Sequence, residues 1–192
     1  MRILQTVPEG SGPRFIRHTG IAAPFLRPNV NTDVIQPINP NSLSEIHSLS
    51  PAERFFEPLR YLPDGSEDPD FVLNQEPYRN ASILLLGENF GTGSSRGVTL
   101  PMAFGIRVMI GPSFAPNFYI SSLRQGLLAV PIEQEVVARI ADWVMSNPGV
   151  VMMVDLERNV IEIPGLEPIS FSIDTWARNK LLLGLSDMDQ ML

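Results

Sequence analysis

A short turn between two apolar segments holds the side chains best suited to chemistry in this chain, at Gly91-Thr92-Gly93-Ser94-Ser95-Arg96-Gly97. The glycines allow a sharp turn, and free N–H groups and serine hydroxyls at the start of a helix can face an anion. Arg96 adds a planar fork of donors that suits a carboxylate. These residues indicate an anion-binding turn, although a capped helix with a solvated arginine accounts for them as well.

The segments beside the turn must hold it at the edge of a sheet. Residues 83–86 are a continuous apolar run, which is typical of a strand buried on both faces. Apolar positions from Val98 to Phe104 predict a short helix with Ser94 or Ser95 as its cap, and residues 106–110 predict a second buried strand. We therefore expect the turn at the carboxyl end of a parallel strand.

The rest of the chain supplies further strands and helices. Residues 20–26 predict an early strand, and helices are expected at 112–123, 133–147 and 175–183, the last capped by Asp174. Short strands are expected at 127–130, 150–155, 160–163 and 169–173. This order predicts the α/β class, with a mostly parallel sheet and an antiparallel addition.

A second polar segment follows the early strand, at Asn29-Val30-Asn31-Thr32-Asp33. Asn, Thr and Asp side chains stabilise turns by bonding to nearby backbone groups. A tight turn with Asp33 as a cap explains the segment without any catalytic role.

Length and composition predict a single domain over residues 1–192, with residues 1–17 as a loose arm. The composition is 44% hydrophobic and 18% charged, and no apolar run is long enough to cross a bilayer. Prolines and glycines interrupt the first 17 residues, so no secretory signal is expected there. These features predict a cytoplasmic protein without a membrane partner.

Charge and ligand chemistry exclude several classes of function. The net charge is −7 and no basic stripe follows the chain, so nucleic acid is not an expected partner. The chain has no cysteine, and His18 and His47 are far apart, so we expect it to hold no metal. A metal would need ligands from another chain.

Two common glycine-rich motifs do not fit the turn. A phosphate-binding P-loop requires Lys and then Ser or Thr after its last glycine, and no Lys is present here. A dinucleotide fingerprint wants a third glycine where Arg96 stands and an acidic residue after the next strand, where the chain has Gly111-Pro112.

Residues 87–96, Gly-Glu-Asn-Phe-Gly-Thr-Gly-Ser-Ser-Arg, resemble the signature loop of the 3-isopropylmalate dehydratase small subunits, a family similar to the swivelling domain of aconitases. The resemblance extends to residues 20–24, 27–29, 32–33, 70–74, 105–107, 112–115, 118–119 and 126–128. It implies a β/β/α three-layer domain that forms a heterodimer with a large subunit carrying a [4Fe–4S] cluster. The implied activity is that of a hydro-lyase, which interconverts 2- and 3-hydroxy isomers of isopropylmalate, in leucine biosynthesis, or of a related 2-substituted malate.

The resemblance also implies roles for particular residues. Ser94 falls on the family's catalytic base and Arg96 on its substrate-carboxylate arginine, while the expected substrate-binding residues are Thr32, Asp33, Thr92, Gly93 and Ser95. Proton removal beside a carboxylate builds up negative charge, which a guanidinium and a helix N-terminus could stabilise. A serine is a poor base in water, so the partner subunit must exclude solvent from Ser94.

The chain departs from the family pattern beside these residues. Gly97 and Val98 stand where the family usually has Glu and His, and Asn31 stands where it often has Asp. Without the polar side chains of that Glu and His, Arg96 would be positioned by other contacts than in the family. Two alternatives therefore stay open: a paralogue with another dicarboxylic hydroxy acid as substrate, and a non-catalytic partner-binding or regulatory relative.

Overall fold

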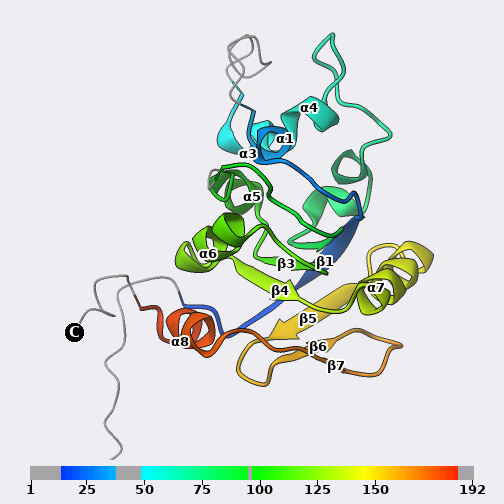
Figure 1. The fold of residues 1–192 in the computed structure, drawn as a ribbon. Helices are drawn as coiled ribbons and strands as arrows, with labels where there is room; N and C mark the ends of the chain where they lie inside the picture. Colours follow the sequence, from blue (N-terminus) through cyan, green and yellow to red (C-terminus); the bar gives the residue numbers. More distant parts are fainter. Residues whose placement is uncertain (1–13, 38–48, 95–96, 186–192) are drawn as a thin grey trace, which may run out of the picture.

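The computed structural model describes residues 14–37, 49–94 and 97–185. These residues form one curled, seven-stranded sheet in the order β4-β3-β2-β1-β5-β6-β7, with helices around it (Figure 1). The strands are β1 (Arg17–Phe25), β2 (Ile83–Leu86), β3 (Val108–Gly111), β4 (Leu128–Pro131), β5 (Val151–Asp155), β6 (Val160–Glu162) and β7 (Ile169–Ser170). The helices are α1 (Thr32–Ile35), α3 (Pro51–Arg54), α4 (Glu57–Arg60), α5 (Thr99–Phe104), α6 (Pro116–Arg124), α7 (Gln134–Ser146) and α8 (Thr175–Leu183), with short 3₁₀ helices at Val72–Asn74 and Tyr78–Asn80.

The sheet has a parallel half and an antiparallel half. Strands β1 to β4 pair in parallel, so the loops that follow β1, β2 and β3 meet at one edge. On the other side of β1, strands β5, β6 and β7 pair antiparallel. The predicted α/β class and the predicted antiparallel addition are confirmed.

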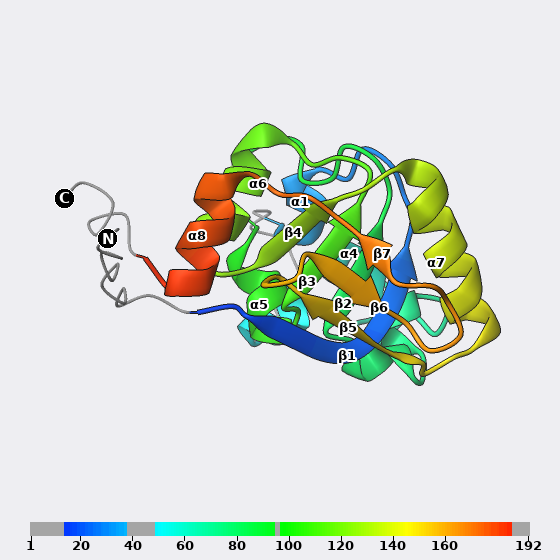
Figure 2. The same cartoon turned by 90° about the horizontal axis from the view of Figure 1, so that it is seen from below.

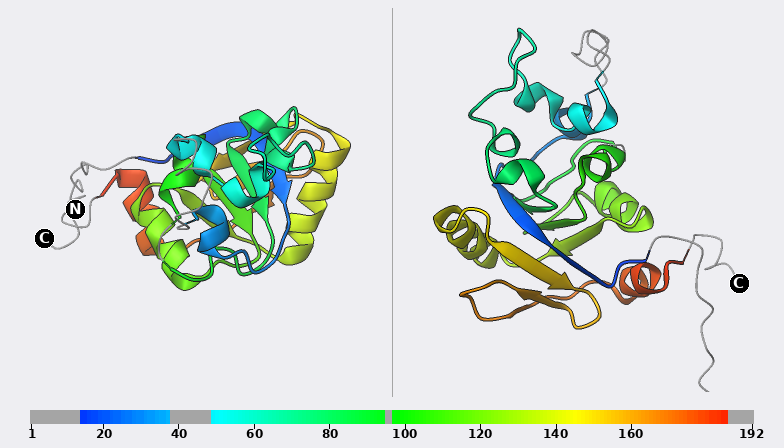
Figure 3. Two further views of the ribbon diagram at one scale, coloured as in Figure 1. Left: turned by 90° about the horizontal axis from the view of Figure 1, so that it is seen from above. Right: turned by 180° about the vertical axis from the view of Figure 1, so that it is seen from behind.

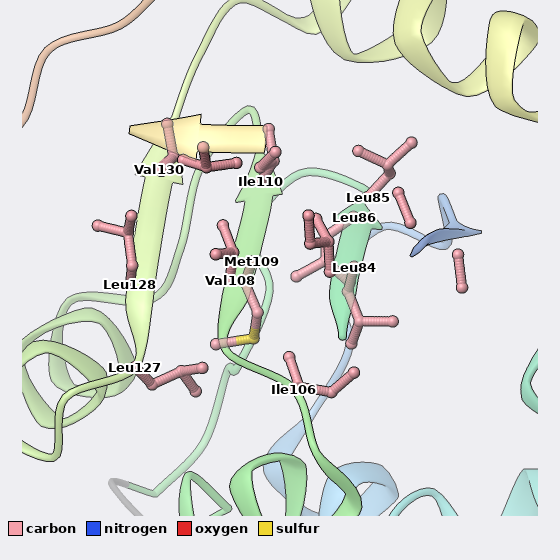
Figure 4. Packing of buried hydrophobic residues seen from close by; sticks show 14 of the residues in the cluster. Leu84, Leu85, Leu86, Ile106, Val108, Met109, Ile110, Leu127, Leu128 and Val130 are labelled. Carbon is pink, nitrogen blue, oxygen red and sulfur yellow. The ribbon is translucent and has the colours of Figure 1, made fainter. Parts of the chain in front are cut away.

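The core lies on both faces of the parallel strands. All four residues of β2 and all four of β3 are buried, as expected from their continuous apolar runs. Figure 4 shows the side chains of Leu85, Met109 and Leu128 among those packed along neighbouring strands. Helix α7 covers one side of these strands, while α5, α6 and α8 lie on the other (Figures 2 and 3). This packing makes the sheet a rigid base for the loops at its edge.

The structure confirms one predicted helix cap and contradicts another. Asp174 caps α8 as expected, because its carboxylate accepts the N–H groups of Trp176 and Ala177. The expectation that Ser94 or Ser95 caps α5 is wrong: this helix begins after Val98, without a side-chain cap. Gly97 has a left-handed φ of 100°, so the chain cannot continue as helix through this residue.

Part of the expected N-terminal arm, residues 1–13, lies outside the described residues. Phe15 is buried, and its N–H donates a 2.8 Å hydrogen bond to the carbonyl of Leu181, while Arg17 already belongs to β1. Across the three described ranges, none of the helices has both the length and the apolar character that crossing a membrane requires.

Candidate functional site

The glycine loop, residues 87–94, leaves β2 at the edge where the parallel strands end. It runs between the segment that follows β1 and the segment that follows β3. Phe90 anchors the middle of the loop: it is fully buried, and its ring meets that of Phe118 from α6 edge to face at 5.4 Å. The loop is therefore attached to the core and not only to its own strand.

Backbone hydrogen bonds tie the glycine loop to the segment after β1. The N–H groups of Gly91 and Thr92 donate to the carbonyl of Val30 at 2.8 and 3.0 Å. In return the N–H of Thr32 donates to the carbonyl of Thr92 at 2.7 Å. These bonds bring together two segments that the sequence separates by about 60 residues, as the predicted parallel sheet requires.

Ser113 ties the other side of the loop to the segment after β3. Its Oγ accepts the N–H of Asn89 at 2.8 Å, and its carbonyl accepts the N–H of Phe90 at 3.2 Å. The N–H of Ala115 then donates to the carbonyl of Phe90 at 2.8 Å. The sequence analysis gave Ser113 no role of its own, and its position two residues after a buried strand was the available signal.

Two glycines of the loop have left-handed backbone conformations and lie close to neighbouring side chains. Gly91 has φ 83°, and a Cβ atom there would lie 2.6 Å from Cβ of Phe118. Gly93 has φ 101°, and a Cβ atom there would lie 3.0 Å from both Oδ1 of Asn31 and Oγ1 of Thr32. Space therefore requires glycine at Gly91, whereas at Gly93 the left-handed φ favours glycine and a Cβ atom would also be in tight contact with α1.

Thr32 contacts the predicted base, Ser94, through two hydrogen bonds. Its Oγ1 accepts the N–H of Ser94 at 3.1 Å and lies 3.3 Å from Ser94 Oγ, and either hydroxyl can be the donor in this second bond. Thr32 is only 2% exposed, whereas Ser94 is partly exposed. Ser95 and Arg96 lie outside the described residues, so their roles stay predictions.

The segment after β1 forms the short helix α1 and not a simple turn. Asn31 caps this helix, because its Oδ1 accepts the N–H of Asp33 at 2.8 Å. The expectation that Asp33 is the cap is wrong; Asp33 lies in the first turn with its side chain exposed. The structure thus brings Thr32, Thr92, Gly93 and Ser94 together and leaves Asp33 at the surface nearby.

Gly97 and Val98 join the core. Val98 is 1% exposed, and a Cβ atom on Gly97 would lie 3.4 Å from Cγ2 of Ile35 in α1. The two residues therefore offer no polar side chain to the loop in front of them. In α6, burial, together with the charge of Asp174, raises the pKa of Tyr119, which packs on Phe114, so the phenol stays neutral.

A cavity of about 260 Å³ lies at the same edge of the sheet, between α7 and the ends of β1, β2 and β3. Leu26, Gly87, Glu88, Pro112 and Val137 are among its lining residues, and Thr92 to Ser94 do not line it. In the part of the chain that the structure describes, no group of three or more metal-binding side chains is placed to hold a metal ion.

Comparisons of the sequence and of the structure with known proteins identify the same family. The aconitase C-terminal domain model matches residues 12–135. The 3-isopropylmalate dehydratase small subunit of Marinobacter nauticus is 42% identical, with 91% of this chain and 85% of the relative covered. That of Granulibacter bethesdensis is 43% identical, with 93% and 86% covered. A crystal structure of 3-isopropylmalate dehydratase (LeuD) from Methanocaldococcus jannaschii has the same fold, with a TM-score of 0.62 at 22% identity and coverage of 92% and 93%. The chain therefore belongs to the aconitase C-terminal domain family and, within it, to the 3-isopropylmalate dehydratase small subunits.

Proposed function

We propose that the chain is the small subunit of a hydro-lyase that interconverts the 2- and 3-hydroxy isomers of isopropylmalate by dehydration and rehydration, in leucine biosynthesis. The observation that carries the proposal is the extent of the family match, more than 40% identity over about nine tenths of the chain. The small subunit acts only with a large subunit, as a cytoplasmic heterodimer, and residues 1–192 are one domain.

Ser94 is the base in this proposal, and the hydrogen bonds around it support the assignment. A base must be held within reach of the proton that it removes. The backbone of the glycine loop is fixed on two sides, and the N–H of Ser94 is bonded to Thr32, so Ser94 has a defined position at the edge of the sheet.

Arg96 binds a substrate carboxylate in this proposal, with Ser95, Thr92 and Gly93 as neighbours and Asp33 on the facing helix. This role is supported by the resemblance of residues 87–96 to the signature loop of the family. A guanidinium two residues after the base is also suited to bind a carboxylate of a dicarboxylic acid. The helix-dipole contribution that the sequence suggested is not part of the proposal, since α5 starts after Val98. The positive charge of Arg96 must therefore provide most of the electrostatic stabilisation of the negative charge that develops on the substrate.

The residues of this chain do not fit an iron–sulfur cluster. The chain contains no cysteine to supply thiolates, and His18 is occupied by a 2.7 Å contact between its Nε2 and Oγ of Ser82. We therefore assign the [4Fe–4S] cluster to the partner large subunit.

The experiment is co-expression with a cluster-bearing large subunit, followed by assay with isopropylmalate and other 2-alkylmalates. We expect turnover of isopropylmalate by the wild-type complex. Ser94→Ala and Arg96→Lys should each abolish turnover without preventing complex formation, whereas Ser172→Ala and Arg139→Lys, which change exposed residues of the same types, should leave it unchanged. Full activity in either site variant would refute the site assignment.

The alternative of a non-catalytic relative keeps one specific observation in its favour. Gly97 and Val98 are packed into the core where the family usually has a polar pair. The same experiment separates the two functions: a stable complex that turns over none of the 2-alkylmalates would support the binding role, and turnover of a different 2-alkylmalate would support a paralogue.

A further inference from the structure

We propose that Thr32 is a positioning residue for Ser94 and not a ligand of the substrate. This inference rests on the proposed role of Ser94 as the base. The threonine hydroxyl is almost completely enclosed, since the residue is 2% exposed, so a substrate that arrives at the sheet edge cannot reach it without displacing the loop.

The hydrogen bonds show how Thr32 acts on its neighbour. Oγ1 of Thr32 accepts the N–H of Ser94 at 3.1 Å, which fixes the backbone of the base. The same oxygen lies 3.3 Å from Ser94 Oγ, and a hydroxyl that accepts one bond still has its own proton to donate. When Ser94 gives up its proton, Thr32 can donate to the resulting alkoxide, and a hydrogen bond to the charged form favours that form.

The surroundings make Thr32 a firm support for this bond. The N–H of Thr32 donates to the carbonyl of Thr92 at 2.7 Å. Thr32 is also the first residue of α1, which is capped by the preceding residue, Asn31. Gly93 leaves room for this contact, because any Cβ atom there would press against Asn31 and Thr32. Backbone and side chain of Thr32 together therefore hold three consecutive residues, Thr92, Gly93 and Ser94.

The test compares Thr32→Val, which keeps the shape and removes the hydroxyl, with Thr32→Ser, which keeps the hydroxyl. Both are assayed in the complex with the large subunit, and Thr19→Val, at an exposed site on β1, is the control. A small misplacement of a catalytic group can cost up to about 100-fold in rate. We expect Thr32→Val to lower kcat by about 10- to 100-fold while KM changes less than about threefold.

Two further results distinguish positioning from a general structural role. Thr32→Ser should restore kcat to within about threefold of wild type. In Thr32→Val the acid limb of the pH profile of kcat/KM should move to higher pH, because the alkoxide loses a donor. Unchanged kcat in Thr32→Val, or equal damage in Thr32→Ser, would overturn the inference.

Amide hydrogen exchange on the full chain keeps the inference separate from the proposed function. The N–H of Ser94 should be protected in the wild type and in Thr32→Ser, and Thr32→Val should lose this protection. An unprotected Ser94 amide in the wild type would overturn the inference even if no variant folds. If the wild-type complex turns over no 2-alkylmalate while Ser94 is protected as expected, the proposed function fails and the positioning contact stands.

Discussion

Replacing Gly91 with alanine is expected to destabilise the chain by about 2–5 kcal/mol, more than the same change at Gly105. Both glycines have left-handed backbone conformations, with φ of 83° and 115°. At Gly105 a new Cβ atom would meet no heavy atom within 4 Å, whereas at Gly91 it would lie 2.6 Å from Cβ of Phe118. The pair therefore separates backbone strain from steric overlap.

The magnitude follows from these two contributions. A left-handed conformation costs a residue with a Cβ about 1–2 kcal/mol relative to glycine, and this cost applies to both variants. Overpacking a full core site adds about 1–3 kcal/mol, and it applies only at Gly91, because Phe118 is fully buried and also packs against Phe90. In a chain of this size 1 kcal/mol corresponds to about 2–4 °C in Tm.

Urea unfolding of the full chain measures the two free energies, and thermal unfolding gives the matching Tm values. We expect Gly91→Ala to have the lower midpoint, by about 1–3 kcal/mol relative to Gly105→Ala. In the complex with the large subunit, Gly91→Ala should also lower turnover, since Phe118 would push the glycine loop away from its bonds to Val30. Equal destabilisation by the two variants would show that the glycine loop moves away from Phe118 at little cost and is not held in one position.

Two other changes test contacts described above. Asn31→Ala removes the cap of α1 and should cost about 0.5–2 kcal/mol in urea unfolding, whereas Asn31→Ser, which can still cap, should cost little; identical losses would contradict the capping role. Burial lowers the pKa of His18, and the charge of Arg107 adds to this effect. The folded chain therefore binds a proton at His18 less readily than the unfolded chain does. As a result, the free energy of unfolding decreases as the pH falls below about 6.5. His18→Gln should reduce the decline of the unfolding free energy between about pH 7 and pH 5, and an unaltered decline would point to other groups.

Strands were the part of the fold that the sequence predicted best. The continuous apolar runs at Ile83–Leu86 and Val108–Ile110 are too short for a typical helix and form strands covered on both faces, and both were located to within two residues. Helix starts were harder. The serines before α5 look like caps by residue type, yet the left-handed backbone at Gly97, visible only in the structure, delays the helix to Thr99.

The candidate site, like the fold, was predictable from the sequence only in part. A glycine loop with a serine hydroxyl at a strand end was predictable, because glycine and serine have strong local preferences. The contact between Thr32 and Ser94 was not, since it joins residues 62 positions apart and depends on how two loops are stacked at the sheet edge. The same holds for Ser113, whose hydroxyl matters only because Asn89 is folded against it.

The antiparallel half of the sheet offers a practical place for a label. In the register of β1 with β5, Arg17 lies opposite Asp155, so the turn that joins β5 to β6 is beside the amino end of β1. The glycine loop lies past the other end of that strand, and Glu157 and Arg158 in the turn are exposed. A small fluorophore attached to the side chain at Glu157 would therefore lie at the end of the sheet opposite the glycine loop, without interrupting the backbone of the turn.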